Sequence, residues 1–198
     1  MSLISETIRD ELVRAYTAPD RHYHNLAHIE AMLGLARSHG GALSDWDAIE
    51  AAIWFHDAVY DTRRHDNEVR SAELAAERLA AVTSPDRIAR IATMIRATAG
   101  HTLPGFSDEG AKHDCALFLD LDLAILGSPA DEFAAYEAAV RREYAWVPEP
   151  LWIEGRRKVV ESFLGRPAIY ASPQFQASHE AAARQNLAQS LAALAHAM

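Results

Sequence analysis

The strongest constraint on the fold is that nearly every long segment repeats its apolar residues at the spacing of an α-helix. The alternation typical of strands is almost absent, and Ala, the best helix former, is abundant. Short breakers containing Gly or Pro separate the segments, and four polar residues precede them as candidate caps: Ser44, Asp66, Ser84 and Ser128. The pattern predicts helices over 3–16, 25–38, 45–59, 67–81, 85–98, 112–126, 130–145, 149–164 and 177–196.

The predicted helices follow one another closely, and the longer connections fall at 99–111 and 165–176. A chain of 198 residues is long enough for one domain with a sizeable core. We therefore expect an all-α fold, a single-domain helical bundle over residues 1–198. Its core would span about 16–170, and 177–196 would form a peripheral C-terminal helix.

The formal net charge of −9, without a Lys/Arg-rich run, argues against a nucleic-acid partner. A small phosphate ester stays compatible, because a local site can be positive on an acidic protein. No apolar stretch approaches the ~18 residues that span a bilayer, and the polar, acidic start is unlike a signal peptide. We expect a cytoplasmic protein without a membrane partner, and a homodimer only as a base rate. The single cysteine, Cys115, lies in the apolar run CALFL and is interpreted as a buried apolar residue.

Residues 52–61 read AIWFHDAVYD, a polar His-Asp pair in an otherwise apolar stretch. A helix that is apolar all round belongs in a core, so His56 and Asp57 should face inward or line a cavity. A buried carboxylate without a partner costs several kcal/mol. Either the two residues bond each other, or a ligand compensates for their burial.

A second motif, RHYHNLAHI, places Arg21, His24 and His28 on one stripe of a helix. Two histidines at i and i+4 can both reach a metal ion or a shared anion. Alternatively Asn25 is the N-cap, and His24 then lies just outside the helix.

Carboxylates occupy the inner faces of two more predicted helices. In CALFLDLDLAILG, Asp122 shares a stripe with apolar residues, whereas Asp120 lies about 160° away and should be an outer or surface residue. Glu68 heads the inward face of 67–81, although it would equally suit the helix dipole there.

Together, two imidazoles and two carboxylates form a candidate ligand set: His28, His56, Asp57 and Asp122. This set suits one divalent ion such as Mn²⁺, Mg²⁺, Fe²⁺, Co²⁺ or Ni²⁺ better than a thiolate-loving metal. One ion would compensate for several costly burials.

The same ordered set, a His, a His-Asp doublet and a distant Asp, resembles the HD superfamily of metal-dependent phosphohydrolases. YHNLAHI, WFHDAVYD, DNEVRSA, LDLDLAILG and REYAWVPEPLWIEGRRKVV are similar to segments of a bacterial group of predicted HD-type hydrolases, and the resemblance covers about 16–170. It implies one tightly bound divalent ion and hydrolysis of a phosphate ester, commonly of a nucleotide. His65 and His101 do not follow the spacing of the two-metal HD families cleanly.

From these residues we expect a mechanism in which the ion activates a water molecule. Glu68 or the outer carboxylate, Asp57, then accepts the proton of that water. Predicted substrate contacts are Arg21, His24, His101 and Lys112. His101 opens a long loop and is alternatively a surface residue, and Arg156 is interpreted as solvent-facing. Two other functions stay open: a module that senses a nucleotide without turnover, and an HD-type di-iron oxygenase, which needs more ligands.

Overall fold

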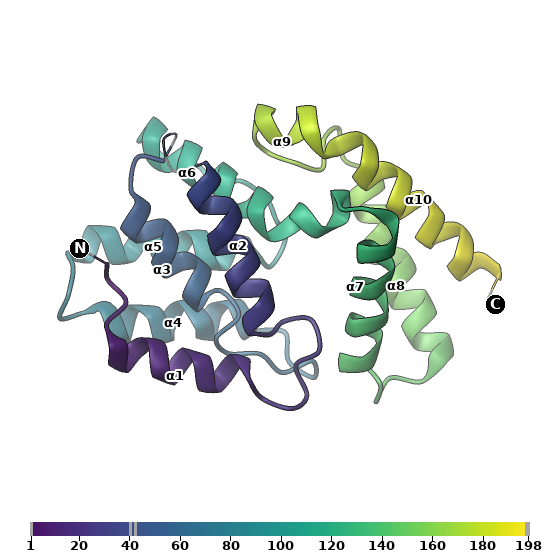
Figure 1. Cartoon of the computed structure of the whole chain (residues 1–198), viewed down its shortest axis with the longest axis horizontal. Coiled ribbons are helices and arrows are strands. Elements are labelled where there is room, and N and C mark those ends of the chain that lie inside the picture. Colours follow the sequence, from purple (N-terminus) through teal and green to yellow (C-terminus); the bar gives the residue numbers. More distant parts are fainter. Residues whose placement is uncertain (1, 40, 42, 197–198) are drawn as a thin grey trace. The chain divides into compact units, whose positions relative to one another are not determined.

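The computed structural model describes residues 2–39, 41 and 43–196, and these residues form helices and no strand (Figure 1). The all-α prediction is therefore confirmed. The chain divides into two compact units, Met1–Asp122 and Leu123–Met198, and each is described by itself. None of the described helices combines the length and apolar character needed to cross a membrane.

The first unit contains six helices in its described part: α1 (Glu6–Tyr16), α2 (Leu26–Ser38), α3 (Trp46–Phe55), α4 (Asn67–Leu79), α5 (Pro85–Ala97) and α6 (Glu109–Asp122). The central one is α3, which contacts α2, α4, α5 and α6. Every residue from Ala48 to Phe55 is buried. The all-round apolar sequence thus produces a core helix, as predicted.

The helix starts differ from the predicted caps at three places. Ser84 accepts a hydrogen bond from the Arg87 N–H, as expected, but Asp45 rather than Ser44 caps α3. Asp66 stands at the start of α4 without a capping bond, because its carboxylate pairs with Arg64. The cap position of α7 is Pro129 rather than Ser128.

The second unit contains a 3₁₀ turn and four helices in its described part: η2 (Leu123–Gly127), α7 (Ala130–Glu143), α8 (Glu149–Leu164), α9 (Pro173–Ser178) and α10 (Glu180–His196). The predicted peripheral helix 177–196 begins at Glu180 and contacts α8, α9 and η2. Arg156 is buried, which corrects its prediction as solvent-facing, because Glu137 and Tyr136 of α7 bind its guanidinium.

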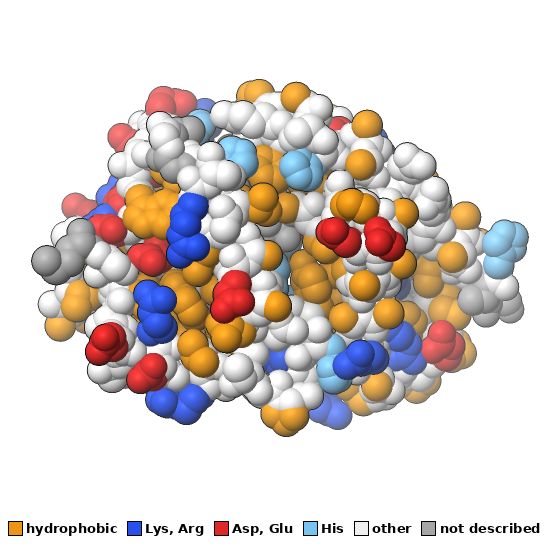
Figure 2. All heavy atoms as spheres, in the orientation of Figure 1, with side chains coloured by type: hydrophobic (Ala, Val, Ile, Leu, Met, Phe, Trp, Pro, Cys, Tyr) orange, Lys and Arg blue, Asp and Glu red, His pale blue; other side chains and the backbone are white. Residues whose placement is uncertain are grey.

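On the face drawn in Figure 2, Lys/Arg and Asp/Glu side chains of the described residues are interspersed with apolar ones. The large apolar side chains exposed among the described residues lie on α4, on α8 and in two connections: Val69, Val82, Trp146, Leu151 and Val159.

Candidate metal centre

His28 is placed by the start of α2. The Asn25 side chain caps the helix by accepting hydrogen bonds from the N–H groups of Ala27 and His28. His24 consequently lies before the helix, so the alternative with Asn25 as N-cap is correct. Its ring still lies near that of His28, 6.3 Å between centroids, and stacks on Tyr60 at 4.4 Å.

His56 is placed by the end of α3, which stops at Phe55 rather than at residue 59. Nδ1 of His56 lies 2.9 Å from the carbonyl oxygen of Ile53. Because a carbonyl only accepts, Nδ1 carries the proton of this bond and Nε2 is the nitrogen left for the site. The doublet therefore sits at a helix end and not within a helix.

Asp122 is the last residue of α6, and its side chain is 13% exposed. Asp120 is also largely shielded, at 1% exposed, which corrects the alternative that placed it at the surface. The reason is that the end of α6 is covered all round: Leu117, Phe118, Leu119 and Leu121 are buried as well.

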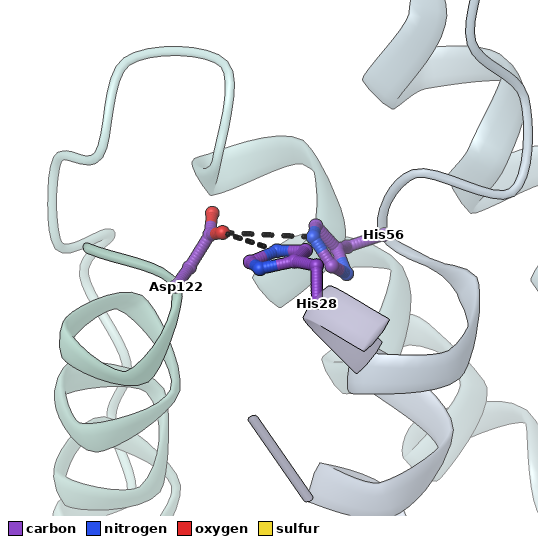
Figure 3. A group of neighbouring side chains, drawn as sticks. All are labelled: His28, His56 and Asp122. Carbon is purple, nitrogen blue, oxygen red and sulfur yellow. Dashed lines mark hydrogen bonds and ion pairs between the residues drawn. The ribbon is translucent and has the colours of Figure 1, made fainter. Parts of the chain in front are cut away.

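The three side chains from these helix ends point toward one another (Figure 3). His28, His56 and Asp122 each offer one ligand atom, and these atoms lie within 4.8 Å of one another. Oδ1 of Asp122 is 3.1 Å from Nε2 of His28 and 3.6 Å from Nε2 of His56. We call these three residues the His–Asp cluster.

His101 adds a third imidazole to Asp122. Its Nε2 lies 2.8 Å from Oδ2 of Asp122, so the two carboxylate oxygens face different histidines. His101 has a φ of 45°, the one positive value among the described non-glycine residues. Such a conformation is unfavourable for a residue with a Cβ and occurs where the surroundings enforce it, often at functional sites.

Asp57 approaches the cluster from beside His56, with Oδ2 3.1 Å from Nε2. Burial opposes ionisation of Asp57, but His56 outweighs it and holds the pKa of this carboxyl below its usual range. The pKa of Asp122 is likewise lowered, because His56, His101 and His28 outweigh its burial. Both carboxylates are therefore charged at neutral pH.

The donor set fits a cation. Among the described residues, Nε2 of His56 is buried without a hydrogen-bond partner, although two carboxylates lie beside it. Burial opposes protonation of His56, yet Asp57 and Asp122 outweigh it and raise the pKa of the imidazole well above its ordinary value. The two carboxylates thus favour a positive charge at Nε2 of His56, which either a proton or a metal ion can supply.

The other predicted site residues lie apart from the cluster or bind elsewhere. Lys112 pairs with Glu109 and lies ten residues before Asp122 on α6, about 15 Å along the helix. Glu68 lies half-buried in the first turn of α4, and the structure shows no bond from it to the cluster. Arg21 binds main-chain carbonyls next to the cluster.

Two buried residues of DNEVRSA, Asn67 and Ser71, were not predicted. Both bind the backbone that follows the His-Asp doublet. They are four residues apart, on the helix face that also buries Ala72 and Ala75, so polar residues on an apolar face were the available signal.

Comparison with known proteins gives no match: no protein-family model fits the chain, and no curated protein or solved structure is significantly similar to it. The HD-type resemblance therefore stays a prediction. What the structure provides is an all-α fold with a His–Asp cluster that could hold a metal ion.

Proposed function

We propose that this protein is a divalent-metal-dependent phosphohydrolase of the HD type, acting on a phosphate ester of a nucleotide or a related small molecule. The observation that carries the proposal is the buried Nε2 of His56, which has no hydrogen-bond partner and lies close to ligand atoms of His28 and Asp122. Two imidazoles and a carboxylate from three helix ends converge where a cation is needed. Their order along the chain is that of the HD signature.

His28, His56 and Asp122 would hold the ion, and Asp57 is the candidate fourth ligand, since its carboxylate lies beside His56. Nitrogen and oxygen donors suit Mn²⁺, Fe²⁺, Co²⁺, Ni²⁺ or Mg²⁺. Such an ion, when bound, polarises a phosphoryl oxygen and lowers the pKa of a water molecule.

In the proposed hydrolysis, a water oxygen attacks phosphorus, the ester P–O bond breaks, and the leaving oxygen takes up a proton. The proton lost by the water passes to a carboxylate, either Asp57 beside His56 or Glu68 of α4. His24 and His101 lie close to the cluster and are the candidates to bind the phosphate oxygens.

Elemental analysis of the purified protein, followed by assays on a panel of nucleotides and simple phosphate esters with added Mn²⁺ or Co²⁺, tests the proposal. We expect bound metal and release of inorganic phosphate, both lost in Asp57→Ala or Asp122→Asn. A protein that binds no divalent ion contradicts the proposal. A protein that binds metal and nucleotide but releases no phosphate is a sensor instead.

A further inference from the structure

The backbone directly after α3 carries Asp57 and belongs to no helix, from residue 57 to residue 61. Backbone N–H and C=O groups that lie partly buried outside regular structure need other partners. In this protein, side chains from two other parts of the first unit supply them.

On one side, the guanidinium of Arg21 donates to main-chain carbonyl oxygens. Nη1 lies 2.7 Å from the oxygen of Asp57 and 3.0 Å from that of His24, and Nη2 lies 3.1 Å from the oxygen of Ala58. The rings of Tyr16 and Tyr60 lie 4.9 and 5.3 Å from its central carbon, at cation–π distance.

On the other side, α4 binds the same segment. Ser71 Oγ lies 3.0 Å from the N–H nitrogen of Val59 and 3.3 Å from its carbonyl oxygen. The Asn67 amide accepts from the N–H of Asp61 at 3.2 Å and donates to its carbonyl oxygen at 3.0 Å. Side chains of Arg21, Asn67 and Ser71 thus bind the backbone of the segment that follows His56.

We propose that Arg21 is a positioning residue, which fastens the loop leading to His28 to the segment carrying Asp57. One planar cation binds the carbonyls of His24 and Asp57 together, so the ligand-bearing ends of α2 and α3 keep their register before any ion binds. Three of the five N–H donors of Arg21 are engaged in this way. The inference rests on the proposed function in one respect, that His28, His56 and Asp57 are metal ligands.

The role differs from the phosphate contact that the sequence alone predicts for Arg21. A phosphate-binding arginine, when removed, weakens phosphate binding and leaves metal binding intact. A positioning arginine, when removed, loosens the ligands themselves, as do other groups that orient metal ligands from outside.

The test compares Arg21→Ala and Arg21→Lys with Arg78→Ala as a matched control. Arg78 also joins two helices of the first unit, α1 and α4, through Glu11, but away from the doublet segment. The measurements are Mn²⁺ affinity by calorimetry, hydrogen exchange of the amides of residues 58–61, and binding of inorganic phosphate.

We expect Arg21→Ala to bind Mn²⁺ about 10–100-fold more weakly, the range found for outer groups that orient ligands, and to exchange these amides faster. Arg78→Ala should change neither. Arg21→Lys should fall between, because an ammonium cannot reproduce the planar fork. If Arg21→Ala does not fold, the Mn²⁺ affinity and amide exchange of Arg21→Lys test the positioning role instead.

Unchanged Mn²⁺ affinity and amide exchange in the Arg21 variants, with phosphate binding lost, would overturn the inference in favour of a phosphate contact. If the unmodified protein binds no divalent ion, the proposed function fails, and amide exchange then decides about Arg21 alone. Unaltered exchange at 58–61 would also overturn the positioning role.

Discussion

Each end of α3 lies against carboxylates that are partly or fully buried, but the two ends neutralise these carboxylates differently. At its start, Asp114 accepts hydrogen bonds from the N–H groups of Ser44 and Asp45, at 2.9 and 2.8 Å. Asp45 in turn accepts from the Ala48 N–H and from Arg87 Nε at 2.8 Å. Backbone donors and a permanent cation therefore satisfy this end, which we call the cap cluster (Asp45, Arg87, Arg90 and Asp114).

At the other end, the carboxylates of Asp57 and Asp122 face imidazoles, which are cationic only when protonated. The helix dipole strengthens the contrast, because a helix start favours anions and a helix end favours cations. In the cap cluster, permanent charges and backbone donors compensate the carboxylates. In the His–Asp cluster, the carboxylates are compensated only when a proton or a metal ion is bound. This difference in charge compensation distinguishes the cap cluster, which is structural, from the His–Asp cluster, the candidate site, at the opposite end of α3.

The largest expected effect comes from changing one carboxylate at each end. Asp122→Asn removes the charge that both His28 and His56 face, so we expect Mn²⁺ affinity to fall by more than the about 100-fold upper range of outer-group changes. Calorimetry on the metal-free protein measures it, and added Mn²⁺ should no longer raise the melting temperature.

Asp114→Asn is the counterpart at the cap cluster. An amide nitrogen facing a backbone N–H leaves a buried donor unsatisfied, which should destabilise the protein by about 1–3 kcal/mol in denaturant unfolding. Its Mn²⁺ affinity should stay unchanged. If Asp114→Asn weakened Mn²⁺ binding as much as Asp122→Asn, the two ends would not be distinct.

The second prediction concerns pH, and its sign follows from His56. Its pKa is raised in the metal-free protein, so the proton contributes stability below about pH 6.5, the usual imidazole pKa, and this contribution is lost as pH rises through the raised pKa. A metal ion must displace this proton. Mn²⁺ affinity should therefore rise by up to about tenfold per pH unit from pH 6.5 and level off above the raised pKa.

Calorimetry in buffers of different ionisation enthalpy checks this directly, because the proton released on Mn²⁺ binding is then counted. Affinity that is flat from weakly acidic to alkaline pH, with no proton released, would show that His56 is not a ligand.

The third prediction uses the backbone conformation of His101. His101→Gly removes the donor to Oδ2 of Asp122 and should weaken Mn²⁺ binding by about 10-fold. Glycine adopts a positive φ without the steric cost of roughly 1–2 kcal/mol, which offsets the lost hydrogen bond, so the metal-free protein should lose little stability. His101→Asn, which tolerates positive φ, is the control for the backbone. A variant that loses stability but keeps Mn²⁺ affinity would make His101 a purely structural residue.

The sequence predicts much of the His–Asp cluster because apolar residues surround His56, share a helix face with Asp122 and lie beside His28. The apolar residues set which helix faces are buried, and so bring His28, His56 and Asp122 together. The end of α3 at Phe55 was not predictable from periodicity, since the apolar pattern continues to residue 59. The helical hydrogen bonds of α3 stop where tertiary contacts begin, since Arg21 and Ser71 bind the backbone that follows Phe55.

The sequence pattern also could not predict the burial of polar residues whose partners come from distant segments. Asp120 was expected to be an outer or surface residue because it lies opposite Asp122 on its helix, and Arg156 was expected to face solvent, but both are buried. For Arg156 the partners are two residues on the preceding helix. Periodicity describes one helix, whereas burial depends on what packs against it.

The smallest effect is expected for Lys112, which lies in the first turns of α6 and pairs with neither charge cluster. Its side chain is half exposed and pairs with Glu109, an interaction worth about 0–1 kcal/mol. Lys112→Ala should change the free energy of unfolding by no more than about 0.5 kcal/mol and leave Mn²⁺ affinity and KM for a phosphate ester unchanged. A KM that rises in Lys112→Ala, and rises less at high salt, would instead make Lys112 a substrate contact. It would extend the binding surface about 15 Å along α6 from Asp122.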